Sequence, residues 1–162
     1  MFGLTQIGVF HTAISLIALV TGIIALIRDG KISWKNLVGK IYVITTVIVC
    51  VTGFFIFQHG GFGKPHVLGI ITLIVLGFAL AAGTEKKPFR KASRYIETIG
   101  FSATFFFHLV PTFTEGLTRL PANAPLASSP DDPTVKLAIG ICFILFLIGV
   151  TFQIKKLRAE NI

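Results

Sequence analysis

The stretch FGLTQIGVFHTAISLIALVTGIIALI, residues 2–27, decides how this chain folds. It contains no Asp, Glu, Lys or Arg, and a transmembrane helix needs about 20 consecutive, mostly apolar residues. Four further stretches without a formal charge follow it, at residues 41–63, 65–84, 98–114 and 137–154. The sequence therefore predicts an all-α, polytopic membrane protein with five transmembrane helices.

The composition supports the same fold class. Of the 162 residues, 53% are hydrophobic and only 14% are charged, and the mean hydropathy is +0.82. A soluble domain of this length leaves a large share of its atoms at the surface, so it has no room to bury so much apolar area. The lipid bilayer is therefore the expected partner. A formal charge of +8 would suggest nucleic acid in a soluble protein, but here the basic residues lie in short clusters between apolar stretches, and no nucleic-acid partner is predicted.

The positions of the 15 Lys and Arg residues predict the orientation. Twelve of them lie in the first connection, the third connection and the C-terminal tail, whereas three, Lys64, Arg119 and Lys136, lie on the other side. Lys and Arg are enriched in cytoplasmic loops, so the N-terminus is expected outside and the C-terminus in the cytoplasm. The chain is expected to form a single domain over residues 1–162. With their flanks, the predicted spans cover residues 4–27, 41–59, 65–84, 95–114 and 134–154.

A stripe of small residues predicts how the helices pack. In the first span such residues repeat at steps of three and four, with one imidazole among them, and a stripe of this kind lets helices approach closely. The fifth span carries no titratable group inside the predicted bilayer. We therefore expect a core of the first four helices and a peripheral fifth helix. The members of the stripe are Gly8, His11, Ser15, Ala18, Gly22 and Ala25.

All four histidines are predicted to lie toward the non-cytoplasmic face. A helix rises about 1.5 Å per residue, so we expect His11 to lie about 10 Å below the outer end of the first helix. His108 is expected about 20 Å above the cytoplasmic end of the fourth helix. In a bilayer core about 30 Å thick, these two positions are at a similar level. His59 ends the second predicted span and His66 begins the third. An ionisable residue within hydrocarbon is costly and often marks function. The sequence therefore predicts a histidine cluster near the outer face.

The leading hypothesis for this cluster is the binding of a transition metal or haem, for redox chemistry or for assembly of a larger membrane enzyme. Three or four imidazoles suit Zn or Cu, and two imidazoles from opposed helices suit haem b. His11 and His108 are predicted to bind the cofactor, and His59 and His66 are predicted as further metal ligands. Glu115 is expected to be one more ligand or to hold an imidazole tautomer from the second shell.

Arg119, near the outer surface, is expected to bind an anion such as a propionate. The histidines also allow a purely structural interpretation, because an imidazole among Ser and Thr residues often does no more than form hydrogen bonds between helices. His59 and His66, beside Gly and Pro, would then be solvated loop residues.

Two other functions stay open. Glu97, Thr104, His108 and Glu115 fall on one stripe of the fourth span, which would suit a proton- or solute-translocating component. Five helices make a small transporter, so that function would require a homo-oligomer or a partner protein. The chain would otherwise be a structural subunit of a membrane complex. No nucleophile–base–oxyanion set is recognisable, and the sequence leaves open whether the chain is an enzyme.

The order of several features is similar to that of a known family. His11 is followed by a basic turn that leads to Gly39-Lys40-Ile41-Tyr42-Val43, and Gly60-Gly61-Phe62-Gly63 comes shortly before His66. This order resembles an uncharacterised family of small bacterial multi-pass membrane proteins, a domain of unknown function, and the likeness covers mainly residues 10–80. The resemblance implies a multi-pass protein of the bacterial plasma (inner) membrane. It implies no particular activity.

Overall fold

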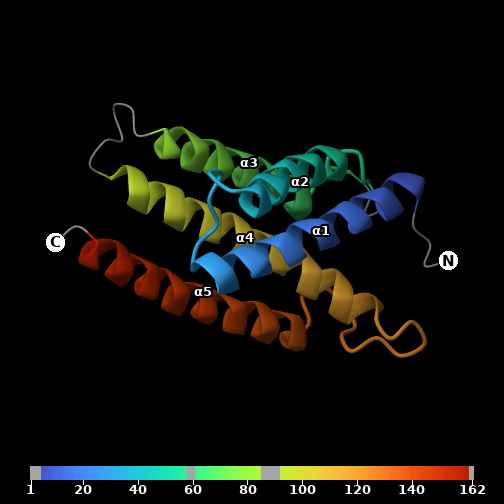
Figure 1. Cartoon of the computed structure of the whole chain (residues 1–162). Helices are drawn as coiled ribbons and strands as arrows, with labels where there is room; N and C mark the ends of the chain where they lie inside the picture. The colour runs from blue at the N-terminus through green and yellow to red at the C-terminus, as the bar shows by residue number, and fades with distance from the viewer. Residues whose placement is uncertain (1–4, 58–60, 85–91, 161–162) are drawn as a thin grey trace.

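The computed structural model describes residues 5–57, 61–84 and 92–160, and these residues form helices and connections without a strand (Figure 1). The all-helical fold class is thereby confirmed. The five helices are α1 (Gln6–Asp29), α2 (Leu37–Gly53), α3 (Lys64–Gly83), α4 (Ser93–Arg119) and α5 (Pro133–Ala159).

Local chemistry explains where the helices begin and end. Asn36 precedes α2, and its side-chain oxygen accepts a hydrogen bond from the Gly39 N–H at 2.9 Å. α1 ends before Gly30, whose φ of 71° lies in the left-handed region that favours glycine. Pro65 lies in the first turn of α3, where a missing N–H costs nothing. These short-range signals separate the helices without any tertiary contact.

Asp132 caps the N-terminus of α5. Its carboxylate accepts hydrogen bonds from the N–H groups of Ser128 and Thr134 at 3.0 and 2.9 Å, and Pro133 follows in the first turn. These two backbone N–H donors, first of all that of Ser128, hold the pKa of Asp132 well below its ordinary value. The cap is therefore strongest when the carboxylate is ionised.

The predicted end of the second span is wrong. α2 ends at Gly53, and Phe54, Phe55 and Ile56 form turns, whereas the sequence predicts a helix that continues to residue 59. Apolar composition alone does not distinguish a helix from an apolar turn. The difference shortens α2 to 17 residues, which span about 26 Å.

Four helices form a closed ring. α1 packs against α2, α2 against α3, α3 against α4, and α4 returns to α1, while α5 packs on the outer side of α4 (Figure 1). The described residues of the main buried cluster come from α1 to α4 and the α1–α2 connection, in keeping with the expected four-helix core and peripheral α5. The cluster consists of Ala25, Ile32, Tyr42, Val43, Leu76, Ala79 and Phe101.

The small residues of α1 face the bundle, as predicted. Gly8, Ala18, Gly22 and Ala25 are buried. At Gly22 a Cβ would lie 2.5 Å from an atom of the Phe105 ring. Only a residue without a side chain lets α1 and α4 approach this closely.

Three of the five helices are long and apolar enough to cross a membrane: α1, α3 and α5. α2 is apolar but shorter, and α4 carries charged residues toward both of its ends. The outward surfaces of the three long helices are rich in exposed Leu, Ile, Val and Phe, which suits contact with lipid acyl chains. Three of the chain's helices are therefore of a membrane-spanning type.

Candidate functional site

A set of polar contacts inside the ring joins α2 to α4. The Tyr42 hydroxyl lies 2.8 Å from Thr104 Oγ1, and Thr46 Oγ1 lies 3.0 Å from His108 Nε2. All four side chains are buried, and the Tyr42 and His108 rings meet edge to face with centroids 6.0 Å apart. We call these four residues, together with His11 and Thr52, the polar interface.

Hydroxyl geometry determines the direction of these hydrogen bonds. Thr46 Oγ1 lies 2.7 Å from the carbonyl oxygen of Tyr42 in its own helix and donates its proton there. It must therefore accept from His108, so His108 carries its proton on Nε2 and keeps a lone pair on Nδ1. Thr104 likewise donates to the Phe101 carbonyl oxygen at 2.8 Å, so it accepts from the Tyr42 hydroxyl.

His11 makes an equivalent contact between α1 and α2. Its Nδ1 lies 3.0 Å from Thr52 Oγ1, and Thr52 donates its own proton to the carbonyl oxygen of Ile48 at 2.8 Å. His11 therefore carries its proton on Nδ1 and keeps a lone pair on Nε2. The ring packs over Gly53, where a Cβ would lie 3.3 Å from the His11 Cε1 atom.

His11 and His108 contact α2 at different places. Thr46 and Thr52 are six residues apart, which corresponds to about 9 Å along α2 and about 120° around it. The two imidazoles thus contact α2 at separate points, through different threonines.

Glu115 and Arg119 form an ion pair one turn apart on α4, and both side chains are partly exposed. The guanidinium predicted to bind an external anion therefore contacts a carboxylate of its own helix. Glu97 lies toward the other end of α4, where its carboxylate packs against Gly83 at the end of α3.

His66 lies in the first turn of α3. Its Nδ1 accepts a hydrogen bond from the Gly63 N–H at 3.2 Å, and its ring packs against Phe57 and Phe62. His59, the other histidine predicted as a metal ligand, lies outside the described residues.

In the part of the chain that the structure describes, no group of three or more His, Cys, Asp or Glu side chains is arranged to hold a metal ion. The structure thus does not show the expected cluster of histidines and Glu115 in this part of the chain. Cys50 and Cys142 are buried and free, as is common for cysteines that act as small hydrophobic residues. Metal or haem binding stays a prediction.

Sequence reasoning missed two partners. Thr46 was not singled out, although it completes the contact of His108. Gln153 was missed as well: its side chain accepts from the Ser102 hydroxyl at 2.9 Å and donates to the Gly30 carbonyl oxygen at 2.9 Å. A lone amide in the apolar α5 is the signal that would have found it, because such a group needs partners inside the protein.

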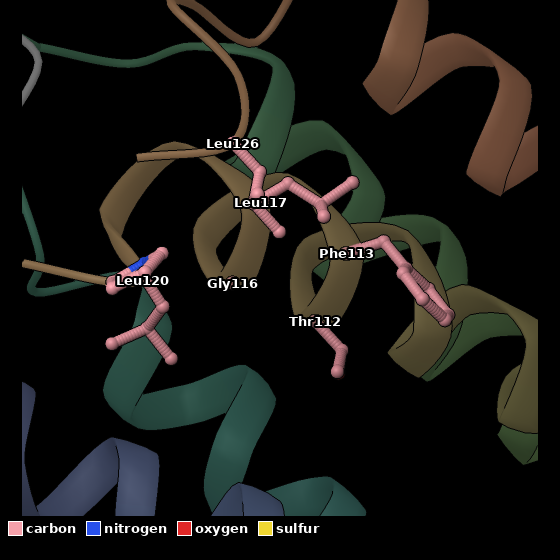
Figure 2. Close-up of a pocket in the computed structure, with 7 residues that line it drawn as sticks. Thr112, Phe113, Gly116, Leu117, Leu120 and Leu126 are labelled. Carbon is pink, nitrogen blue, oxygen red and sulfur yellow. The ribbon is translucent and has the colours of Figure 1, made fainter. Parts of the chain in front are cut away.

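A cavity of about 410 Å³ lies at the C-terminal end of α4 (Figure 2). It is open and almost entirely apolar, so it offers little that would orient a substrate. Its lining residues are Thr112, Phe113, Gly116, Leu117, Leu120, Pro121 and Leu126.

Comparison of the chain with protein-family models, curated proteins and solved structures finds no match.

Proposed function

We propose that the chain is an integral membrane protein that crosses the bilayer five times, with its N-terminus outside and its C-terminus in the cytoplasm. The distribution of Lys and Arg supports this orientation. The beginning of α1 and the end of α5 lie at opposite ends of the bundle, as an odd number of spans requires (Figure 1). α2 spans about 26 Å as a helix, so the residues that flank it complete its crossing of a core about 30 Å thick.

Cysteine labelling in inverted and right-side-out vesicles tests the orientation. After Cys50→Ala and Cys142→Ala, a single cysteine at Ala122 should react with an impermeant maleimide from outside. A single cysteine at Ala159 should react only from the cytoplasmic side. The reverse pattern, or both positions labelled from one side, contradicts the topology.

We propose further that the polar interface moves protons as part of a translocating membrane component. The supporting observation is His108: a 6% exposed imidazole inside the four-helix ring, with an N–H bonded to Thr46 and a lone pair left on its other nitrogen. A neutral imidazole in this state accepts a proton on one nitrogen and releases one from the other. An ionisable group is retained at such a depth mainly where it has a role.

The surrounding groups extend this path in both directions. Contacts of the polar interface with α2 run from Tyr42 to Thr52, which is about 15 Å along the helix axis. Glu97 and Glu115 lie 18 residues apart on α4, about 27 Å, which is close to the thickness of the hydrocarbon core. Carboxylates near both ends would exchange protons with water, and the imidazoles between them would carry the transfer. Reorientation of the threonine hydroxyls is part of each transfer.

Proton flux into liposomes tests this function. Protein is reconstituted with a pH-sensitive dye inside, and a potassium gradient with valinomycin drives proton entry. His108→Gln keeps a donor for Thr46 but has no titratable nitrogen, so we expect the flux to fall by at least tenfold. His66→Gln, a histidine outside the polar interface, is the matched control and should keep the wild-type flux. Wild-type flux equal to that of empty liposomes refutes the proposal.

A second candidate function is binding of a transition metal or haem by His11 and His108. The specific support is that both rings are held as neutral tautomers, each with one nitrogen lone pair outside its hydrogen bond to threonine. Their separate positions on α2 favour proton transfer over a shared ion. Metal analysis and a visible spectrum decide the question. Metal in near-stoichiometric amount, or a Soret band, supports binding if it is lost in His11→Ala and in His108→Ala. Wild-type protein that carries neither metal nor haem, after expression with both supplied, refutes the binding function.

A further inference from the structure

His66 has one ring nitrogen occupied by its own helix. Nδ1 accepts from the Gly63 N–H at 3.2 Å, which caps the first turn of α3. The neutral ring must therefore carry its proton on Nε2, because only one nitrogen of a neutral imidazole is a donor. The backbone contact thus determines which nitrogen is left for a second partner.

That second nitrogen has no hydrogen-bond partner in the part of the chain that the structure describes. The His66 side chain is 5% exposed, and among the described residues Nε2 is a buried side-chain nitrogen without a hydrogen bond. A buried N–H group without an acceptor is destabilising, and most buried polar groups in proteins are paired. The cost is understandable if an acceptor from another molecule occupies this position in the membrane.

Two aromatic rings flank the imidazole. Phe57 lies nearly parallel to the His66 ring and Phe62 is tilted by 30° against it, each with a centroid distance of 5.2 Å. Phe57 and Phe62 are 56% and 68% exposed, so both rings face the surroundings of the protein. Gly61, with a φ of 135° and open space where a Cβ would be, precedes Phe62 in the turn before α3.

The chemistry of this site selects its ligand. The donor is neutral and lies among phenyl rings. The neighbouring cation, Lys64, is 93% exposed and within 3.8 Å of Asp131. An anion would gain little here, whereas a carbonyl oxygen matches a single neutral donor and a planar ring matches the exposed phenyl faces. A phospholipid ester offers the carbonyl without the ring.

We propose that His66, Phe57 and Phe62 bind the head group of a membrane-soluble quinone. One quinone carbonyl oxygen accepts a hydrogen bond from His66 Nε2–H, and the quinone ring stacks on Phe62 after that side chain swings away from the imidazole. The step is binding alone, with no electron transfer. The site depends on the placement of α3 in the membrane and not on proton movement through the polar interface.

Binding of ubiquinone-1 and of menadione to the full chain in phosphatidylcholine nanodiscs tests the proposal by isothermal titration calorimetry. His66→Leu should weaken binding by about threefold to tenfold, the amount expected for one hydrogen bond. His66→Gln should recover part of it, because the amide restores an N–H donor. Phe62→Leu should also weaken binding, since it removes a stacking surface. His108→Gln is the control and should bind like the wild type even if it abolishes proton flux.

Two results overturn the proposal: no saturable binding of either quinone to the wild type, or equal affinity in the wild type and His66→Leu. If His66→Leu does not fold, the wild type still decides the question. In protein labelled with ¹⁵N-histidine, the Nε2–H proton resonance of His66 should move downfield on addition of menadione. An unchanged resonance contradicts a hydrogen bond to the quinone.

Discussion

Replacement of Thr46 by valine tests the polar interface most directly. The Thr46 side chain is fully buried and accepts from His108 Nε2 at 3.0 Å. Valine has a similar shape but no hydroxyl, so Thr46→Val leaves the His108 N–H buried without an acceptor. Hydrogen bonds between membrane helices contribute about 0.6 kcal/mol on average and up to about 1.7 kcal/mol. Because both partners are buried, we expect Thr46→Val to lower the free energy of unfolding by about 1 to 1.7 kcal/mol.

Thr45 provides a matched control for this measurement. It is also buried, but among the described residues its hydroxyl bonds only carbonyl oxygens of its own helix, those of Ile41 and Tyr42. Thr45→Val should therefore change the free energy of unfolding by close to zero. Unfolding is measured by titration with SDS in mixed micelles, followed by far-ultraviolet circular dichroism.

A double-mutant cycle separates the hydrogen bond from other effects of the substitution. Once His108→Leu has removed the donor, Thr46→Val should cost about 1 kcal/mol less than it does in the wild type. Equal losses for Thr46→Val and Thr45→Val, or an additive double variant, would show that the contact between Thr46 and His108 does not stabilise the bundle.

Three further predictions concern packing and capping. Gly22→Ala places a Cβ 2.5 Å from the Phe105 ring and should lower the free energy of unfolding by about 1–3 kcal/mol. Gly140→Ala is the control, because a Cβ there meets nothing within 4 Å. Equal unfolding curves for the two variants would contradict the close packing at Gly22. The pKa of Asp132 is lowered in the folded state, so its cap stabilises above about pH 3.9 and is lost as the pH falls. Asp132→Asn should weaken this acid dependence, measured as SDS unfolding at pH 3 and pH 6, and an unchanged dependence would count against the cap. Gln153→Leu removes the hydrogen bonds to Ser102 and Gly30 and should loosen α5. Amide hydrogen exchange should then become faster in α5 but not in α2. Equal acceleration in both helices would indicate global destabilisation instead.

Much of the fold could be predicted from the sequence because its causes are local. The cap at Asp132 and the turn at Gly30 depend on residues within a few positions of each other. The small residues of α1 predict the buried face because helical spacing alone places them on one side. The end of α2 was missed, since Phe54 and Phe55 continue the apolar composition after the helix has ended.

The candidate site could be predicted only in part. The sequence indicates that His11 and His108 face the interior, and the structure places both at helix contacts. Their partners, Thr52 and Thr46, are threonines of a kind that occurs throughout the apolar helices, so composition does not distinguish them. The role of His66 as a cap depends on a backbone N–H group three residues earlier, which residue types alone do not show.

The sequence by itself determined that this chain contains membrane-type helices and which face of α1 is buried, because apolar length, charge and helical periodicity act over neighbouring residues. Only the tertiary structure decided which groups meet. The contact of His11 with Thr52 joins positions 41 residues apart, and that of His108 with Thr46 joins positions 62 residues apart. The way α2 lies against α1 and α4 sets these pairs, and with them the protonated nitrogen of each imidazole.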